Sequence, residues 1–513
     1  MTNAGLDNTP GSPRRGEFTA MRPERRVSCR IAIVGTCVPF LAAALVGMFV
    51  WAGQAWSQGA TRDAALKALS RAVTYFHNQV AVQNTYVWAY SADLAERRGE
   101  SGVVDAQTSW IQPPGTPAIG AAFLRAFEAT GEKPYLEAAH GVARALMLVQ
   151  LQSGGWYYSA VLGEDRRKDW CYAGNAKNAC KEIAANEFKN RSVLDDNTTQ
   201  AALGFLIWYD QLSGASDPEV RRAINYGMKR LMRLQYQNGA FPVFSDWRDD
   251  DDGGAPLRQA NLPEGGWPRE WVKPASLPYF VLNDDLLRDV IRLLLYAGRV
   301  YDCGQCVKSA KAAGEFLLAA QLPAPQRGWA QTYDKNMQPV WGRVFEPPAA
   351  ASRETAGSIQ ALLLLHQTSG DSRYLQSVRE AVEWLKSVRL EDGDWARFYE
   401  LATDKPLYVN SENEATYSSG DLLGHYNLKS TFEIPMVIDL AERRLKGQPA
   451  VTSRYWENAA DRWSRETLGE RVAGLVATQE PEGRWVDEGW ISSQKFIDAV
   501  FALARFVDEG QDR

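Results

Sequence analysis

The feature that most constrains the fold is a motif that occurs five times along the chain. Each copy ends an apolar, helix-like stretch, usually with a glutamine, and continues through a glycine-bearing turn to an aromatic residue. The aromatic residues lie about 65 to 90 residues apart, an interval that holds two helices with their loops: Trp156, Phe241, Trp329, Trp395 and Trp485. A glycine after the last apolar turn is a common helix stop. The motif therefore predicts a chain built from repeated helical hairpins.

The segments between the copies favour the same architecture. Apolar residues recur with a helical period, for example in PYLEAAHGVARALMLVQLQ and in DDLLRDVIRLLLYAGRVYD, whereas strand signals are few and short. Repeated hairpins of this size close into a toroid or a solenoid. We expect an all-α fold, an α/α toroid of repeated helical hairpins with short irregular strands in the loops around a central cleft. Such toroids carry sugar-active enzymes, terpenoid cyclases and binding proteins, so the fold alone does not give the function.

The N-terminal residues have the layout of a secretory signal. Four arginines precede an uncharged run from residue 31 to about residue 53, and the small residues of AWSQGA follow. The uncharged run is long enough to span a bilayer, so an uncleaved membrane anchor is the alternative. We expect residues 1–57 to form this extension and residues 58–513 to form one toroid domain outside the cytoplasm, periplasmic or secreted.

Cysteine content and charge narrow the classes of partner. Four cysteines follow the extension, and an even number outside the cytoplasm predicts one or two disulfides: Cys171, Cys180, Cys303 and Cys306. The net charge of -5 gives no reason to expect a nucleic-acid partner. None of the four histidines has metal-ligand spacing, which counts against a His-rich zinc site.

Two loops place several oxygen-bearing side chains directly before apolar helical runs. VLDDNTTQ contains Asp195, Asp196 and Asn197, and YFVLNDDLL contains Asn283 and Asp284. If a toroid brings the loops together, they form an oxygen-rich site for a hard cation such as Ca²⁺. The same residue types also cap helix N-termini, so capping is the alternative role, and both roles can hold together.

The order of the polar and aromatic loop motifs resembles family 10 of the pectate lyases. The series is LDDNTTQ, GGWP, LNDD, GWAQTYD, GRVFEPP followed by RET, ARFYEL with KPLY, and HY at residues 425–426. The resemblance extends from about residue 154 to residue 426, and its specificity comes from the joint occurrence of the motifs in order. It implies an exported lyase that cleaves polygalacturonate by calcium-assisted β-elimination and gives C4–C5 unsaturated oligouronides.

The chemistry of such a reaction explains why these residue types are needed. The lyase removes the proton on C5 of a uronate, next to a carboxylate, and expels the group on C4. A hard divalent cation on oxygen ligands neutralises that carboxylate and stabilises the developing enediolate. An enzyme of this class therefore needs carboxylates for the metal, cations for the polyanion, and a base.

The resemblance assigns these roles to particular residues. Asp196 and Asp284 are the first choices as Ca²⁺ ligands, with Asp195, Asn197 and Asn283 beside them. Arg343 in WGRVFEPP matches the position of the family's catalytic base. A guanidinium has a pKa above about 12, so Arg343 either acts as a base in a dry cleft or stabilises the carbanion while solvent takes the proton. On residue type alone, Arg343 could also be a surface arginine paired with Glu346.

The resemblance also indicates substrate contacts. Arg397 and Tyr426 match the positions that grip the uronate, where a guanidinium can bind a carboxylate through two hydrogen bonds. Further candidates are three tryptophans that could stack on sugar rings or simply pack at helix ends, and one glutamine: Trp156, Trp267, Trp329 and Gln331. Many relatives continue the first Gly-Gly-Trp turn with Pro-Lys, whereas this chain has GGWYYS. We expect Lys189 or Arg191 to compensate for that lysine.

Two other functions remain open on the sequence. A toroidal glycoside hydrolase would need two carboxylates about 5–9.5 Å apart, and Glu346, Glu354 and Asp284 are its candidates. A non-catalytic polysaccharide-binding protein would keep the cleft without turnover. In each case the expected partner is an acidic polysaccharide, and we expect a monomer.

Overall fold

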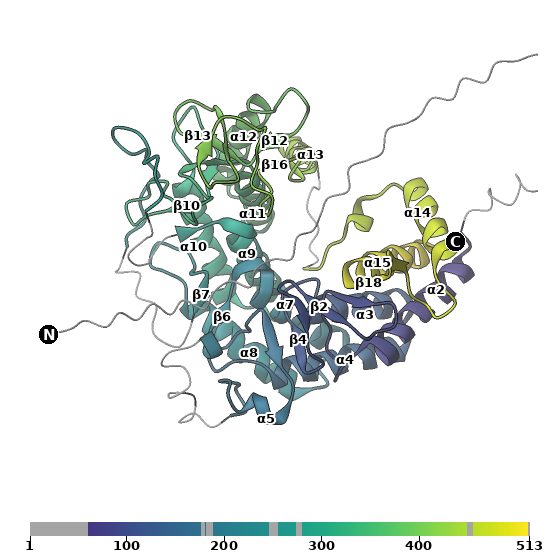
Figure 1. Cartoon of the computed structure of the whole chain (residues 1–513). Helices are drawn as coiled ribbons and strands as arrows, with labels where there is room; N and C mark the ends of the chain where they lie inside the picture. The colour runs from purple at the N-terminus through teal and green to yellow at the C-terminus, as the bar shows by residue number, and fades with distance from the viewer. Residues whose placement is uncertain are drawn as a thin grey trace, which may run out of the picture.

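The computed structural model describes residues 60–175, 180, 188–245, 255–272, 280–448 and 455–510. The expected signal or anchor at residues 1–57 lies outside these ranges. Within them, no helix has both the length and the apolar character needed to cross a membrane. Helices dominate the described chain, and most belong to antiparallel hairpins in which one helix lies in an inner row and the other in an outer row (Figure 1).

The inner helices pack side by side in a curved row, in the order α13, α11, α9, α7, α3 and α15. Their bounds are α3 Thr116–Thr130, α7 Thr198–Leu212, α9 Leu286–Tyr301, α11 Ser352–Ser369, α13 Ile434–Leu445 and α15 Ser493–Glu509. The outer helices are α2 Arg62–Tyr75, α4 Lys133–Leu148, α8 Pro218–Arg233, α10 Gly304–Ala320, α12 Ser372–Ser387 and α14 Arg465–Thr478. The yellow C-terminal helix α15 returns to the purple N-terminal helices α2 and α3 (Figure 1). The prediction of an all-α toroid of helical hairpins is confirmed.

The residue patterns explain which helix lies inside. The outer helix α8 buries one stripe at helical spacing and leaves charged residues on its other face. The inner helix α7 is buried at every residue from Thr198 to Asp210. A helix that is apolar nearly all round needs neighbours on all sides, and the inner row provides them.

The recurring motif of the sequence ends the outer helices. In four copies the indole N–H donates to a carbonyl in the last turn of the preceding helix, at 2.8–3.0 Å, and so satisfies a group that the helix leaves without a partner: Trp156, Trp329, Trp395 and Trp485. The motif glutamines donate across to the next outer helix. The amide of Gln150 donates to the carbonyl of Ala223 in α8 at 3.1 Å. The amide of Gln479 donates to the carbonyl of Ala68 in α2 at 2.9 Å. The motif therefore both stops a helix and joins neighbouring hairpins.

The strands are short, antiparallel and confined to the connections. Two five-stranded sheets have the orders β17-β18-β1-β2-β3 and β15-β14-β13-β11-β9, and the two-stranded sheets are β8-β10, β12-β16, β4-β5 and β6-β7. The strand bounds are β1 Ala89–Ser91, β2 Arg97–Gly99, β3 Gly102–Val104, β4 Thr108–Trp110, β5 Ser159–Val161, β6 Ser192–Val193, β7 Phe244–Ser245, β8 Phe280–Val281, β9 Trp329–Ala330, β10 Thr332–Tyr333, β11 Ala349–Ala351, β12 Trp395–Ala396, β13 Phe398–Glu400, β14 Pro406–Val409, β15 Ala415–Thr416, β16 Lys429–Ser430, β17 Val486–Asp487 and β18 Trp490–Ser492.

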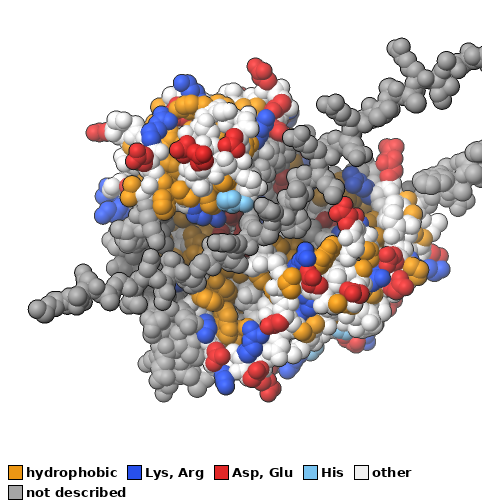
Figure 2. Space-filling view, in the orientation of Figure 1, with side chains coloured by type: hydrophobic (Ala, Val, Ile, Leu, Met, Phe, Trp, Pro, Cys, Tyr) orange, Lys and Arg blue, Asp and Glu red, His pale blue; other side chains and the backbone are white. Residues whose placement is uncertain are grey.

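One buried apolar core extends from Ala65 in α2 to Val507 in α15. The four cysteines form two local disulfides, Cys171–Cys180 and Cys303–Cys306. On the face shown in Figure 2, acidic and basic side chains are interspersed rather than gathered by sign. The short strands position the loops that enter the inner helices, and those loops carry the polar residues singled out in the sequence.

Candidate active site

The two acidic loops have the same backbone conformation. In the first, β6 is followed by the single helical turn η4 Asp195–Asn197 and then by α7. In the second, β8 is followed by η5 Asn283–Asp285 and then by α9. Both turns place two consecutive non-glycine residues in the left-handed region, with φ of 48° and 57° in η4 and 50° and 62° in η5. Aspartate and asparagine tolerate this region better than most residues. Asp196 and Asp284 therefore occupy equivalent positions in two copies of one loop.

The left-handed turns rule out the capping role expected for these residues. Asn197 and Asp285 occupy the N-cap positions of α7 and α9, but neither side chain accepts a hydrogen bond from its helix. A typical N-cap has extended backbone angles, which aim the side chain at the helix N–H groups. Here the backbone turns the other way. The alternative role of helix capping is therefore wrong for Asn197 and Asp285, the residues at the two N-cap positions.

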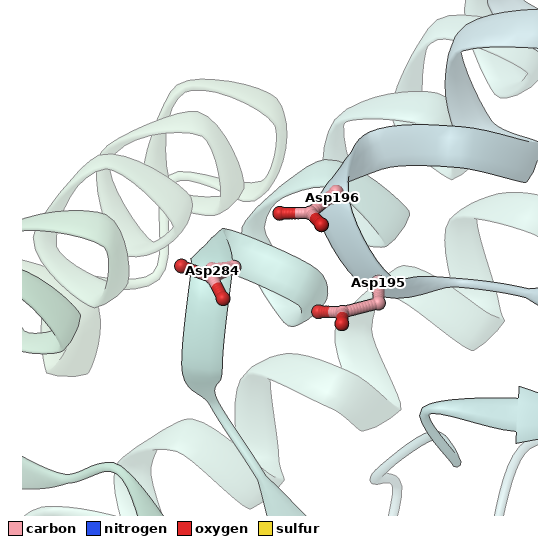
Figure 3. Close-up of side chains that lie close together, drawn as sticks. All are labelled: Asp195, Asp196 and Asp284. Atoms are coloured by element: carbon pink, nitrogen blue, oxygen red, sulfur yellow. The ribbon is translucent and has the colours of Figure 1, made fainter. Parts of the chain in front are cut away.

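Three of these carboxylates converge. Asp195 and Asp196 come from one loop and Asp284 from the other, and their side chains point toward a shared space (Figure 3). One oxygen of each lies within 4.8 Å of the others, and all three side chains are half-buried. The approach of α11 to this region requires a glycine, because a Cβ at Gly357 would lie 2.1 Å from Oδ1 of Asp285. Two loops almost ninety residues apart in sequence thus form one acidic cluster.

The amide side chains predicted beside the cluster are turned to other partners. Oδ1 of Asn197 accepts from the hydroxyl of Tyr455 at 3.0 Å. Oδ1 of Asn283 accepts from Arg397 at 2.9 Å, and its amide nitrogen donates to Asp284 at 2.5 Å. Of the five oxygen-bearing residues that the sequence offered, the structure thus brings the three carboxylates together, and the two amides hold neighbouring groups.

Two residues that sequence reasoning missed donate to the cluster. The hydroxyl of Tyr158 donates to Asp195 at 3.0 Å, and the amide of Gln112 donates to Asp196 at 2.9 Å. Tyr158 lies in the GGWYYS turn, where the chain departs from the Pro-Lys of the family that its motifs resemble, and that departure was the available signal. Gln112 lies in WIQPPG, far from any motif, and nothing in the sequence marked it.

The cluster holds more negative charge than its surroundings balance. Burial, together with the charge of Asp284, raises the pKa of Asp195 to about 6. Burial and the charges of Asp195 and Asp284 raise the pKa of Asp196 to about 8. Asp195 and Asp196 thus become harder to ionise because they are buried and because other carboxylates are close. Hard oxygen donors that repel one another in this way suit a hard divalent cation such as Ca²⁺, which would replace the bound protons.

Two arginines contact residues of the second loop through a hydrogen bond and an ion pair, and a glutamate pairs with both arginines. Arg397 is 3% exposed and donates to Glu354 at 2.6 Å as well as to Asn283. Nη1 of Arg353 lies 3.0 Å from Oδ1 of Asp284. The RET segment supplies both Arg353, which had no role assigned from the sequence, and Glu354, a candidate carboxylate of the alternative hydrolase. Arg397, expected to grip substrate, is instead largely enclosed and holds Asn283.

Arg343 is the most open cation near the cluster that the sequence singled out. Its side chain is 52% exposed, and its guanidinium is paired with Glu346. The same guanidinium lies 4.9 Å above the ring of Phe345 and 5.4 Å from that of Tyr426. Burial alone would lower the pKa of Arg343, but its hydrogen bonds with Glu346 and the charge of that residue raise the pKa above its ordinary value. The charge of Arg343 in turn offsets part of the rise in the pKa of Asp195 that burial and Asp284 cause.

Tyr426 and Gln331 surround the other side of this ion pair. The hydroxyl of Tyr426 donates to Glu346 at 3.0 Å and approaches Oε1 of Gln331 at 3.3 Å. The ring of Tyr426 also lies 4.4 Å from the guanidinium of Arg397, so it separates the two arginines. Glu346 accordingly keeps a pKa below its ordinary value despite its burial, because Arg343 neutralises it.

The tryptophans expected to stack on sugar rings are covered. Trp156 and Trp329 are fully buried and donate to helix carbonyls. Trp267 is 7% exposed, and the guanidinium of Arg269 lies 4.2 Å above its ring. Buried indoles offer no face to a ligand, so the stacking role was wrong for Trp156 and Trp329, and packing at a helix end is their role. Trp267 keeps one ring face against the guanidinium of Arg269.

Trp156 is accordingly expected to contribute to stability. Replacing it with alanine should lower the free energy of unfolding by about 3–5 kcal/mol through lost packing. Replacement with phenylalanine keeps most of the ring but loses the hydrogen bond to Leu146, and should cost about 1–2 kcal/mol. Denaturant unfolding of the three proteins measures the difference. A stable alanine variant with weakened substrate binding would restore the stacking role.

The two basic residues expected to replace the missing lysine lie directly before β6, the strand that leads into the first loop. The guanidinium of Arg191 lies 5.5 Å from the ring of Phe244, which packs 6.5 Å from the ring of Tyr158. Arg191 is thus one aromatic ring removed from the residue that contacts Asp195. Lys189 is half-buried in the turn η3 Phe188–Asn190 that precedes β6.

Comparison with known proteins yields similarity in structure only. No protein-family model matches the chain, and no curated protein matches it in sequence. A mutant family 10 polysaccharide lyase from Cellvibrio cellulosa, solved with trigalacturonic acid, is 16% identical, with 64% of this chain and 97% of that chain covered and a TM-score of 0.42. An unsaturated glucuronyl hydrolase specific for heparin is 12% identical, with 88% and 98% covered and a TM-score of 0.43. A family 76 glycoside hydrolase (mannosidase) from Bacteroides thetaiotaomicron is 10% identical, with 88% and 99% covered and a TM-score of 0.45. Likeness at this level concerns the fold alone.

Proposed function

We propose that this protein is an exported polysaccharide lyase that cleaves polygalacturonate by calcium-assisted β-elimination. The observation that carries the proposal is the convergence of three carboxylates from two loops close to the partly exposed cation of Arg343. The ordered series of loop motifs, from LDDNTTQ to ARFYEL, supports the same substrate class. An acidic polymer suits a site in which a metal and an arginine present positive charge together.

In this proposal Asp195, Asp196 and Asp284 hold the Ca²⁺. The bound ion supplies positive charge that neutralises the uronate carboxylate and so acidifies the proton on C5. The protein fixes the three ligands through Tyr158, Gln112 and Asn283, which donate to them. Such outer partners set the orientation of metal ligands and strongly affect metal affinity.

Arg343 is the proposed catalytic residue. In the elimination the C5–H bond breaks, a C4–C5 double bond forms, and the C4–O bond breaks as the leaving oxygen takes up a proton. Arg343 is held between Phe345, Tyr426 and Glu346, which fix the plane of its guanidinium. In this arrangement the guanidinium is charged, so it favours stabilisation of the carbanion while solvent takes the proton from C5.

The proton balance of the cluster predicts how Ca²⁺ stabilises the protein as pH changes. The pKa values of Asp195 and Asp196 are raised in the folded protein to about 6 and about 8. An unfolded chain releases these protons near pH 4. Without metal, stability therefore falls as pH rises from about 4 to about 8, because the folded state binds more protons. Ca²⁺ removes this repulsion, so the rise in melting temperature on adding Ca²⁺ should grow between about pH 5 and pH 8.

Thermal melts with Ca²⁺ and with a chelator, across that pH range, measure this dependence. The variant Asp196→Asn should flatten the pH dependence of the Ca²⁺ effect, because it removes the carboxyl group with the higher pKa. A Ca²⁺ effect that is equal at all pH values, or largest in acid, would contradict the assignment of these carboxylates to the cation.

Ultraviolet absorbance tests the proposed function directly. The mature chain, about residues 58–513, is mixed with polygalacturonate in the presence of Ca²⁺ and then of a chelator. A C4–C5 unsaturated uronide absorbs in the ultraviolet, so a rising trace that the chelator abolishes is the expected result. A flat trace, with an active lyase as control, would contradict the proposal.

One observation favours a second candidate, a glycoside hydrolase on a uronic-acid polymer. Asp196, with a pKa of about 8, is protonated at neutral pH in the metal-free protein, as a general acid must be. The candidates named from the sequence fit this role less well, because Glu346 is paired with Arg343 and Glu354 is buried with Arg397. New reducing ends without ultraviolet absorbance would establish hydrolysis.

A further inference from the structure

Arg353 lies among three carboxylates behind the acidic cluster. Its Nη1 is 3.0 Å from Oδ1 of Asp284 and 3.6 Å from Oε1 of Glu354, and its Nη2 is 3.5 Å from Oδ2 of Asp285. Asp285 and Glu354 each have a second arginine, because Arg288 lies 3.0 Å from Asp285 and Arg397 lies 2.6 Å from Glu354. Among the described residues, Asp284 has its shortest contact with a cation at Arg353.

The equivalent carboxylate in the first loop has a different kind of partner. Asp196 accepts from the neutral amide of Gln112, whereas Asp284 faces a full positive charge. A guanidinium beside Asp284 partly balances the cluster when no metal is bound. The same charge opposes a metal ion that approaches Asp284, because like charges a few ångströms apart repel strongly where water is scarce.

Two buried atoms show that the present position of Arg353 leaves contacts unmade. Nη1 of Arg353 has no well-directed hydrogen bond to a described residue, and neither does Oε2 of Glu354. The two residues are adjacent in sequence and already within 3.6 Å of each other. A small displacement of the guanidinium from Asp284 toward Glu354 would bring these two groups closer, while Asp285 remains within reach.

We propose that the guanidinium of Arg353 takes the place of the metal ion in the metal-free protein. It pairs with Asp284 there and moves away from Asp284 when a divalent cation binds. Arg353 thereby sets the cation affinity of the cluster and is a positioning residue rather than a ligand. The inference rests on the proposed Ca²⁺ site. The Ca²⁺ proposal concerns the metal-bound protein. The present inference concerns the metal-free protein, which is the state that Arg353 stabilises.

The variant Arg353→Met tests this, because it keeps an unbranched apolar stem and removes the charged guanidinium. If the contact with Asp284 exists only without metal, its loss destabilises only the metal-free state. Calorimetric titration with Ca²⁺ should then show affinity at least about tenfold tighter than wild type. In thermal melts the chelated variant should unfold at a lower temperature than chelated wild type, and saturating Ca²⁺ should narrow the difference.

Two further variants serve as controls. Arg353→Lys keeps the charge and should bind Ca²⁺ within about threefold of wild type. Arg327→Met removes an arginine of similar exposure, 33% against 27%, which pairs with Glu380 and has no part in the cluster. This second control should leave Ca²⁺ affinity unchanged. Because Asp285 and Glu354 keep Arg288 and Arg397, the methionine variant retains a partner for each buried carboxylate.

The outcomes separate this inference from the proposed function. If wild type binds Ca²⁺ and Arg353→Met binds it with equal or weaker affinity, the inference is overturned and the Ca²⁺ site stands. If melting temperatures fall equally with and without Ca²⁺, Arg353 is merely structural and the inference is again overturned. If wild type binds no divalent cation, the proposed site and the inference fall together.

Discussion

Replacing Asp196 or Asp284 with asparagine is expected to weaken Ca²⁺ binding by on the order of 100-fold and to reduce elimination to a similar degree at limiting Ca²⁺. Asparagine keeps the size of the side chain but removes one of three negative charges that face the shared space. Both losses should be large, because the two residues occupy equivalent positions in two copies of one left-handed turn. Calorimetric titration and the ultraviolet assay measure the two effects independently.

The same equivalence predicts a smaller effect for the neighbouring aspartate. The position of Asp195 in the first loop corresponds to Asn283 in the second, where an amide is accommodated. Asp195→Asn should therefore cost about tenfold in Ca²⁺ affinity. Asp392→Asn is the control, because it changes an exposed carboxylate that is paired with Lys429. It should leave Ca²⁺ affinity unchanged. A larger loss for Asp195→Asn than for Asp196→Asn would reverse the assignment.

The fold could be predicted from the sequence because the same residue types recur at a regular interval, at the end of each outer helix. A tryptophan after a glycine turn donates its indole N–H to the end of the preceding helix, and that requirement recurs wherever an outer helix stops. The sequence showed the recurrence without its purpose. Trp156 and Trp329 were consequently open to two roles, stacking on sugars or packing at helix ends, and the repeat needs them inside the protein.

The acidic cluster was predictable only in part. Two Asp- and Asn-rich loops before apolar helices indicated an oxygen-rich site, and the toroid brings the two loops side by side. Residue type could not show that each loop passes through two left-handed residues, since Asp and Asn suit both a helix cap and that conformation. Gln112 and Tyr158 come from two other connections of the chain and Arg353 comes from the first turn of α11, and only the tertiary fold brings them to the cluster.

Replacing Arg343 with alanine is expected to lower kcat by about 10³-fold while KM changes by less than about threefold. The guanidinium is the most open of the arginines singled out near the cluster, and its neighbours hold it in place rather than cover it. Its loss removes positive charge where the reaction develops negative charge, so turnover suffers more than binding. Steady-state kinetics in the ultraviolet assay give both constants. A binding-only protein would show no turnover to lose, and a merely structural Arg343 would change stability instead.

The variant Glu346→Gln separates the two roles that Arg343 could take. If neutral Arg343 removed the C5 proton, loss of the Glu346 charge would lower the pKa of Arg343, enlarge its neutral fraction at a given pH, and shift the pH–rate profile to lower pH. If charged Arg343 stabilises the carbanion, it stays charged in both proteins over the working range, and the profile does not move. Because a guanidinium stays charged over this range even without Glu346, we expect an unmoved profile. A shift toward lower pH, with faster turnover in alkali, would instead identify Arg343 as the base.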